Sequence, residues 1–308
     1  MQLSEFIDNY ESLTSKITCL CGSKWHLPIK PQERFRIPVR FSMCTQCGHV
    51  YAANPMRADA LETFYSSALY RDLYSSGFSV ENHIAKLNVP YRSKTSLWNI
   101  SESLLPSSGG NVLEWGCGGG WNLIPFRDFG HSVIGVDVNE PYLEAGRRIL
   151  NLDLRTISTQ TLNDISQIKF DVIILNHVLE HLLNPEELLN DLKALCSLST
   201  KFVIGLPTLE TIKEYGFDRY FTIAHIHYFS VASFSRFLSR CGLSIEATHK
   251  TQGGLTFVAG FKSSSGVRRE RFGFLKSLFL LNRSFLEFHL RKFAKNLLSR
   301  TKLTKRFK

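Results

Sequence analysis

The segment from residue 111 to residue 140 constrains the fold of this chain more than any other. It reads NVLEWGCGGGWNLIPFRDFGHSVIGVDVNE, in which a short apolar run ends in Glu114 and a second apolar run ends in Asp137. The pattern predicts a strand, a glycine-rich turn, a helix, and a second strand that ends in an acid. Glycines at alternate positions of the turn permit torsions closed to other residues and a close approach to a ligand. These glycines are Gly116, Gly118 and Gly120.

The spacing of the glycines bears on the identity of the ligand. A dinucleotide-binding loop has the spacing G-x-G-x-x-G, which requires a glycine where this chain has Trp121. A carboxylate two residues before the first glycine, Glu114, suits the ammonium group of S-adenosylmethionine and is badly placed beside a pyrophosphate. The segment therefore favours S-adenosylmethionine over a nicotinamide dinucleotide. An acid in the position of Asp137 can hold the ribose hydroxyls of either ligand.

A third segment, residues 170–192, reads FDVIILNHVLEHLLNPEELLNDL, as expected for a buried strand, a polar turn and an amphipathic helix. With it, the chain resembles the class I S-adenosylmethionine-dependent methyltransferases. The resemblance rests on LEWGCGGG, GVDVN, FDVIILNHVLEH and VIGLP, and covers about residues 106–262. It implies an α/β fold with a Rossmann-like, seven-stranded sheet. Residues 243–250 and 254–261 read as a closing strand pair after a helix at 231–241, which fits the antiparallel seventh strand of that plan.

The resemblance also implies roles for single residues. Glu114 and Gly116 would lie beside the methionine moiety, Gly118 and Gly120 would let the loop approach the ligand, and Asp137 would bind the ribose. Asn176 and His177 would lie near the sulfonium, with His181 and His225 facing the substrate. Histidine is the usual base for removing an acceptor proton, so the candidate catalytic residues are His177, His181 and His225. The alternative is that Glu180 and His181 only cap and pack a helix.

Two short cysteine pairs, each followed by glycine, predict a structural zinc site near the N-terminus. The candidate ligands are Cys19, Cys21, Cys44 and Cys47. The first pair has the spacing C-x-C instead of C-x-x-C, so His26 or His49 could replace a ligand, and buried thiols without a metal are the alternative. A zinc ribbon ahead of this domain resembles the N-terminal part of sugar C-methyltransferases. Ala224 stands where that family has glutamate, which puts proton abstraction from a sugar carbon in doubt.

The charge of the chain is concentrated in its last residues. The 308 residues carry a net charge of +10, but residues 263–308 alone carry +11 and the rest −1. A neutral body argues against a nucleic-acid-binding catalytic face. In the tail, Phe274, Leu278, Leu281, Phe285 and Phe288 form one helical stripe with basic residues around it, which suits an anionic membrane surface. A helix packed on the body, a dimer interface and nucleic-acid contact are the alternatives.

These observations predict four parts and a cytoplasmic enzyme. The basic tail favours peripheral contact of residues 267–308 with the inner face of the membrane. The parts are a zinc-ribbon-like domain at 1–65, a helical connector or lid at 66–105, the methyltransferase domain at 106–262 and the basic tail at 263–308. No apolar run reaches the ~18 residues that span a bilayer. We expect methyl transfer to a nucleotide- or lipid-linked sugar in polysaccharide or natural-product biosynthesis. The alternatives are a small-molecule or lipid O-methyltransferase and a non-catalytic scaffold, and the oligomeric state stays open.

Overall fold

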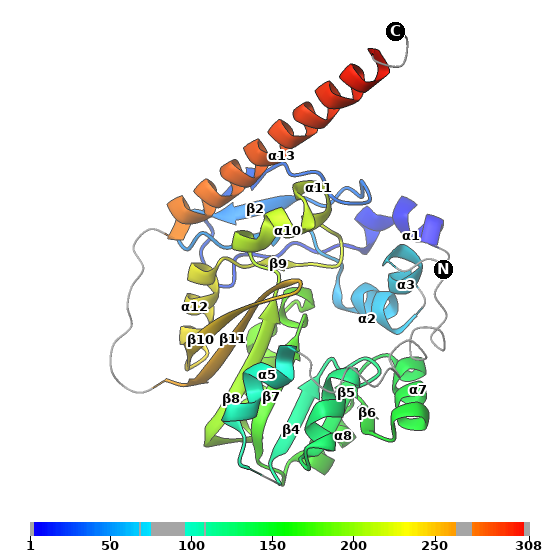
Figure 1. The fold of residues 1–308 in the computed structure, drawn as a ribbon, viewed down its shortest axis with the longest axis vertical. Coiled ribbons are helices and arrows are strands. Elements are labelled where there is room, and N and C mark those ends of the chain that lie inside the picture. The colour runs from blue at the N-terminus through cyan, green and yellow to red at the C-terminus, as the bar shows by residue number, and fades with distance from the viewer. Residues whose placement is uncertain (1–2, 68, 75–95, 108, 263–272, 305–308) are drawn as a thin grey trace.

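The computed structural model describes residues 3–67, 69–74, 96–107, 109–262 and 273–304. Its centre is a sheet in the order β10-β11-β8-β7-β4-β5-β6, seen in the lower half of Figure 1. The strands are β4 (Asn111–Trp115), β5 (Ser132–Asp137), β6 (Asp153–Thr156), β7 (Phe170–Asn176), β8 (Cys196–Leu206), β10 (Leu243–Thr251) and β11 (Gly254–Phe261). The first five are parallel, whereas β11 runs antiparallel to β8 and to β10. The predicted α/β methyltransferase sheet is thereby confirmed.

Helices cover both faces of this sheet, and the sequence of its central strands shows why. Along β7, Val172 and Ile174 pack into one apolar cluster while Ile173 and Leu175 pack into the other. A strand that is apolar at every position buries both of its faces, as parallel sheets require. The covering helices are α5 (Ser96–Ser101), α6 (Ile124–Asp128), α7 (Glu140–Leu150), α8 (Thr159–Ile165), α9 (Pro185–Lys193) and α12 (Val231–Arg240).

A second, four-stranded sheet forms most of the N-terminal unit, in the order β1-β2-β3-β9. Its strands are β1 (His26–Ile29), β2 (Phe41–Cys44), β3 (Val50–Ala52) and β9 (His227–Tyr228). Three short helices accompany it: α1 (Leu3–Asp8), α2 (Ala58–Ser66) and α3 (Leu69–Tyr74). Because β9 lies between β8 and α12 in the chain, the segment predicted as the methyltransferase domain contributes an edge strand to the N-terminal unit. The four predicted parts stay a prediction, and most of the connector at 66–105 lies outside the described residues.

The tail forms one long helix, α13 (Gly273–Thr304), which extends away from the body in Figure 1. The apolar stripe predicted from the sequence packs on the body of the protein, which was one of the alternatives for the tail. Leu281 is buried, and Phe274 and Leu278 pack with it against α10 (Ile212–Tyr215), α11 (Phe217–Tyr220) and the turn before them. Further along the helix, the Phe285 ring lies 5.5 Å from the Phe217 ring. In the described part of the chain, no helix is both long enough and apolar enough to span a bilayer.

The first residue of α13 rests against the turn that follows the second cysteine pair. A side-chain carbon added at Gly48 would overlap the carbonyl oxygen of Gly273, so the two glycines make a close backbone contact. Gly48 also has a φ of +76°, which glycine adopts at no steric cost. Farther along, the Ser277 hydroxyl lies 3.3 Å from the Ser230 hydroxyl at the start of α12. The helix is therefore seated on both the cysteine turn and the methyltransferase body.

Gly48→Ala is expected to loosen α13, and Gly22→Ala provides a matched control. Gly22 also follows a cysteine and has a φ of +78°, but nothing lies within 4 Å of a carbon added there. Both variants bear the cost of a left-handed alanine, whereas only Gly48→Ala adds a steric overlap, worth about 1–3 kcal/mol of unfolding free energy. Urea denaturation and hydrogen exchange in the first turns of α13 measure the difference. Equal effects of the two substitutions would contradict this account of the docking.

Candidate functional site

The glycine-rich loop after β4 is folded back beneath the end of β5. The backbone N–H groups of Gly116 and Cys117 both donate to the carbonyl oxygen of Val136, at 2.7 and 3.0 Å. Gly116 has a φ of +77°, and a side-chain carbon there would lie 2.6 Å from a methyl group of Val178. Glycine is therefore required at position 116 both by its torsion and by the close approach of the segment that follows β7.

Asp137, at the end of β5, fixes the shape of this loop. Its Oδ2 accepts a hydrogen bond from the backbone N–H of Gly118 at 2.8 Å, and its Oδ1 accepts one from Asn139 at 2.8 Å. Each carboxylate oxygen keeps a second lone pair, because one oxygen can accept two hydrogen bonds. The predicted role of Asp137 in binding a ribose stays a prediction, and the structure adds a second task, which is to hold the loop.

Glu114 lies under the loop with one of its two oxygens unsatisfied. The residue is 1% exposed, and its Oε1 accepts a hydrogen bond from the Asn122 side chain at 2.7 Å. Its Oε2 has no hydrogen-bond partner among the described residues. Burial raises the pKa of Glu114 to about 8, the Asn122 hydrogen bond opposes this shift, and the negative charge of Asp137 adds to it. A buried carboxyl oxygen without a partner fits the ammonium group of a ligand.

The end of β7 carries Asn176 and His177 in a strained turn. His177 has a φ of +57°, which is uncommon outside glycine, and its backbone N–H donates to the Gly205 carbonyl at 3.0 Å. The Asn176 side chain lies directly against Gly205, where no side chain would fit. The His177 ring turns toward Glu180, with Nδ1 3.1 Å from Oε1. Strain of this kind persists only where the surroundings fix it, and it concentrates at functional sites.

Glu180 is the centre of a cluster of three histidines. Its side chain is fully buried, and its backbone carbonyl accepts a hydrogen bond from Ile226 at 2.7 Å. Burial alone would raise the pKa of Glu180, but the hydrogen bond from His177 and the electrostatic influence of the neighbouring imidazoles lower it to about 2. The pKa of His177 responds in the opposite sense, since the effect of burial is outweighed by Glu180 and the pKa is raised. The pair is therefore a carboxylate beside a readily protonated imidazole.

The other two histidines are held neutral beside this carboxylate. The rings of His181 and His225 lie 4.8 Å apart, and burial lowers the pKa of both, that of His225 to about 3. His181 Nδ1 lies 2.9 Å from the carbonyl oxygen of Ala224, whereas His225 Nδ1 has no partner among the described residues. One atom each of Glu180, His181 and His225 lies within 4.8 Å of the others, a spacing that a shared cation could bridge. The structure thus brings all three predicted histidines together.

Tyr65 of α2 links the histidine cluster to the end of β5. Its hydroxyl lies 2.7 Å from His181 Nδ1, and its backbone carbonyl accepts a hydrogen bond from the Asn139 side chain at 3.2 Å. The Tyr70 ring lies beside it at a tilt of 44°, with ring centres 5.2 Å apart. A tyrosine pair at this spacing is usually core, so only the tertiary contact identifies the pair with the site. Nor does sequence spacing show that Glu180 is the hub of the cluster.

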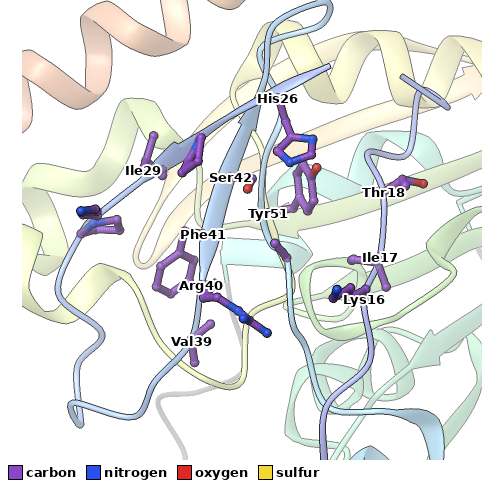
Figure 2. Close-up of a pocket in the computed structure, with 14 residues that line it drawn as sticks. Lys16, Ile17, Thr18, His26, Ile29, Val39, Arg40, Phe41, Ser42 and Tyr51 are labelled. Carbon is purple, nitrogen blue, oxygen red and sulfur yellow. The ribbon is translucent and has the colours of Figure 1, made fainter. Parts of the chain in front are cut away.

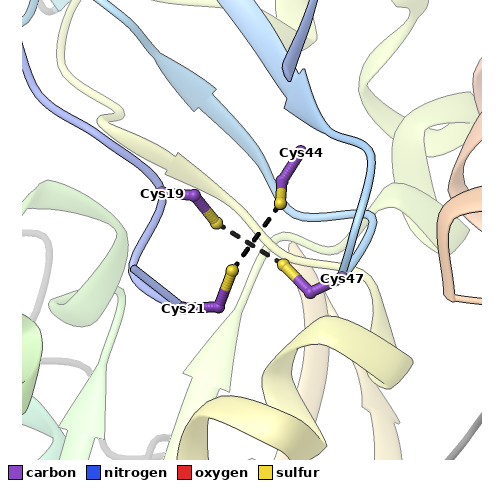
Figure 3. A group of neighbouring side chains, drawn as sticks. All are labelled: Cys19, Cys21, Cys44 and Cys47. Atoms are coloured by element: carbon purple, nitrogen blue, oxygen red, sulfur yellow. Dashed lines mark hydrogen bonds between the residues drawn. The ribbon is translucent and has the colours of Figure 1, made fainter. Parts of the chain in front are cut away.

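The four candidate metal ligands meet at one point in the N-terminal unit (Figure 3). The Sγ atoms of Cys19 and Cys47 lie 3.4 Å apart, those of Cys21 and Cys44 lie 3.6 Å apart, and all four lie within 4.8 Å of one another. Four thiolates around Zn²⁺, each about 2.3 Å from the ion, would be separated by about 3.8 Å. The C-x-C spacing therefore fits a tetrahedral site without a histidine, and His49 instead contacts His227, with ring nitrogens 3.0 Å apart.

A basic groove of about 720 Å³ lies on the N-terminal sheet (Figure 2). Its floor is largely apolar and includes Phe41 and Tyr51, and three cationic side chains line it. In Figure 2, Lys16 and Arg40 reach into the groove from opposite walls, and Lys30 is the third cation. No acidic residue lines it among the described residues. Cations that converge without a counterion favour an anionic ligand.

Comparison with known proteins agrees with this geometry. A family model described as a methyltransferase domain matches residues 92–248, a little over half of the chain. The ubiquinone biosynthesis O-methyltransferase of Bartonella tribocorum is 31% identical over 121 residues, which cover 37% of this chain and 48% of that protein. Its counterpart from Pelagibacter ubique is 29% identical over 126 residues, 39% of this chain and 51% of that protein. These alignments span about half the length of the curated relatives.

Solved structures of methyltransferases also align with the chain. Magnesium protoporphyrin IX methyltransferase from Synechocystis is 19% identical, with a TM-score of 0.44, over 66% of this chain and 99% of that one. An S-adenosylmethionine-dependent methyltransferase from Mesorhizobium loti is 17% identical, with a TM-score of 0.43, over 55% and 99%. These TM-scores lie below 0.5, so family membership rests on the domain model. The chain belongs to the methyltransferase domain family, and it is a class I S-adenosylmethionine-dependent enzyme.

Proposed function

We propose that this enzyme transfers a methyl group from S-adenosylmethionine to a hydroxyl group of a small-molecule acceptor. The observation that carries the proposal is the ionised Glu180 beneath three imidazoles, in a segment that touches the glycine loop where Val178 meets Gly116. A proton acceptor and a cofactor loop in contact are what an O-methyl transfer needs. The names of the curated relatives, which are O-methyltransferases aligned along about half of their length, support a hydroxyl acceptor.

The cofactor fits the residues around the loop. Bound S-adenosylmethionine supplies an electrophilic methyl group on its sulfonium. Glu114 would pair with the ammonium group through its free Oε2, and Asp137 would accept from the ribose while it holds Gly118 in place. The glycine loop would lie along the ligand, with Gly116 nearest the methionine moiety. Asn176 and His177 would lie beside the reacting centre.

Ligand binding at Glu114 is expected to release a proton. The pKa of about 8 leaves Glu114 protonated at pH 7 in the free protein, and an adjacent ammonium group favours the ionised form. The affinity for S-adenosylhomocysteine should therefore rise as the pH rises from 6 to 8. Calorimetry in buffers of different ionisation enthalpy measures the released proton directly. Glu114→Gln should abolish the release of the proton. NAD serves as the negative control for ligand binding. A wild-type protein that binds S-adenosylhomocysteine with no proton release would contradict the role of Glu114.

The histidine cluster would remove the proton of the acceptor hydroxyl. His225 is neutral, its Nδ1 has no partner in the described part of the chain, and the Glu180 carboxylate would stabilise an imidazolium formed beside it. His181 orients the pair through its contacts with Ala224 and Tyr65. Ala224 contributes only its carbonyl oxygen at the place where the sugar C-methyltransferases have a carboxylate. This favours a hydroxyl over a carbon as the methyl acceptor.

His225→Ala is expected to lower turnover at least about 100-fold, the range for loss of a general base, with the affinity for S-adenosylhomocysteine near that of the wild type. His249→Ala, at an exposed position on β10, is the matched control and should retain full turnover. The assay uses S-adenosylmethionine with a ¹³C-labelled methyl group and a panel of phenols, catechols and sugars, and NMR identifies the labelled atom. Unchanged turnover in His225→Ala would remove this residue from the mechanism, and a carbon-bound label would overturn the proposed O-methylation.

A nucleotide- or lipid-linked sugar is a second candidate acceptor, and one observation favours it. The basic groove offers Lys16, Lys30 and Arg40 to an anionic group, such as the diphosphate of an activated sugar. If such a sugar is the acceptor, Arg40→Ala should raise its KM and leave the KM of a neutral phenol unchanged. Equal KM values for the sugar in the wild type and the variant would show that the groove does not bind the acceptor.

We further propose that the four cysteines hold one structural zinc ion. The hydrogen bond from the Cys19 thiol lowers the pKa of Cys47 to about 5, and thiolates are the ligands that Zn²⁺ requires. Metal analysis of the purified protein should find one zinc per chain. Cys44→Ser should lose the zinc and unfold at a lower temperature, whereas Cys196→Ser, at an isolated cysteine, should keep it. A wild-type protein without zinc that folds equally well after treatment with a chelator would contradict the proposal.

A further inference from the structure

We propose that a second face of α13, composed of Leu275, Phe279, Leu286 and Leu290, binds the surface of an anionic lipid bilayer. This face is not the stripe predicted from the sequence, which lies against the body. Such binding would place the enzyme at a membrane surface, whichever acceptor it methylates.

The four side chains form one exposed apolar stripe. They are 56%, 62%, 60% and 59% exposed, in chain order, and the steps of four, seven and four residues between them place them on the same side of the helix. The large apolar side chains that are exposed in the described part of the chain number ten, and half of them lie on α13. Exposed apolar side chains that gather on one surface mark a site of interaction.

The body of the protein cannot cover this stripe without losing contacts that it already has. The opposite side of the helix is committed to the body through Leu278 and Leu281. The start of the helix is fixed by the close contact of Gly273 with Gly48 and by Ser277 against Ser230. Figure 1 shows α13 extending beyond the rest of the fold, so an extended surface such as a membrane could reach its exposed side.

The charge of α13 favours a lipid surface over a second copy of the chain as the partner of the apolar stripe. The helix contains seven basic residues and one acidic residue, Glu287, which is paired with Arg283 at 2.8 Å. Lys276 and Arg283 lie beside the apolar stripe and are exposed. Two such helices would repel each other, whereas an anionic leaflet attracts each basic residue near its surface. A helix with an exposed apolar stripe flanked by basic side chains can lie in the interface of an anionic membrane.

Vesicle binding of the full chain tests the proposal. Flotation is measured with phosphatidylcholine vesicles and with vesicles that contain phosphatidylglycerol in addition, at low and high salt. The wild type should float with the anionic vesicles only, and binding should weaken at high salt because salt screens the charges. The double variant Leu286→Ser/Leu290→Ser should lose at least about tenfold in partition coefficient, since it removes half of the apolar stripe.

Leu198→Ser is the matched control, because Leu198 is 88% exposed and lies on β8, away from the helix. It should bind vesicles as the wild type does. The proposal is overturned if the wild type does not float with anionic vesicles, or if the double variant and the control bind equally. It is also overturned if the wild type sediments as a dimer that the double variant dissociates, because the stripe would then be an interface between two copies. None of these outcomes depends on methyltransferase activity.

Discussion

The site depends on one buried carboxylate. Glu180 has no exposure to solvent, and an unpaired charge in such a place would cost several kcal/mol. His177 pairs with it, the imidazoles of His181 and His225 lie beside it, and each histidine comes from a position that the fold determines. His177 follows β7 in a left-handed turn, His181 lies one turn further on, and His225 arrives on the segment whose next residue, Ile226, donates to the Glu180 carbonyl. Removing the carboxylate would leave the histidines without the charge that sets their different protonation states.

The N-terminal unit is part of this arrangement. Its sheet takes β9 as an edge strand, and β9 follows directly after His225 and Ile226. Its helix α2 supplies Tyr65, which contacts His181 and Asn139 and so bridges the histidine cluster and the end of β5. The cysteine cluster lies in the same unit, and α13 begins against the turn that follows its second pair. The cysteine cluster, the site and the tail helix are thereby physically connected.

The sequence predicted the features that local patterns encode. The strands that end near Glu114, Asp137 and Asn176 were recognisable because each apolar run is followed by a polar or glycine-rich turn. The antiparallel strand pair at the end of the sheet was recognisable in the same way. What local patterns could not show is which partner each segment meets. A two-residue strand, β9, has no periodicity of its own, and its place in the N-terminal sheet follows only from tertiary contacts.

The two apolar faces of α13 illustrate the same limit. Helical spacing identified the stripe that contains Leu278 and Leu281, but spacing is silent on whether a stripe meets protein or lipid. Residues on another side of the helix, such as Phe279 and Leu286, form the exposed face. Glu180 is a comparable case, since a glutamate beside a histidine is a common helix-capping pattern. Only its burial and its three histidine neighbours identify it as the centre of the site.

NMR titration of ¹⁵N-labelled histidines, in the wild type and in Glu180→Gln, tests this account most directly. In the wild type, His177 should titrate above the ordinary pKa of 6.5, and His225 should stay neutral at every pH from 5 to 8. In Glu180→Gln, burial acts on His177 unopposed, so its pKa should fall below 6.5. If His177 and His225 titrate together near 6.5, or if the pKa of His177 is the same in both proteins, Glu180 does not organise the cluster.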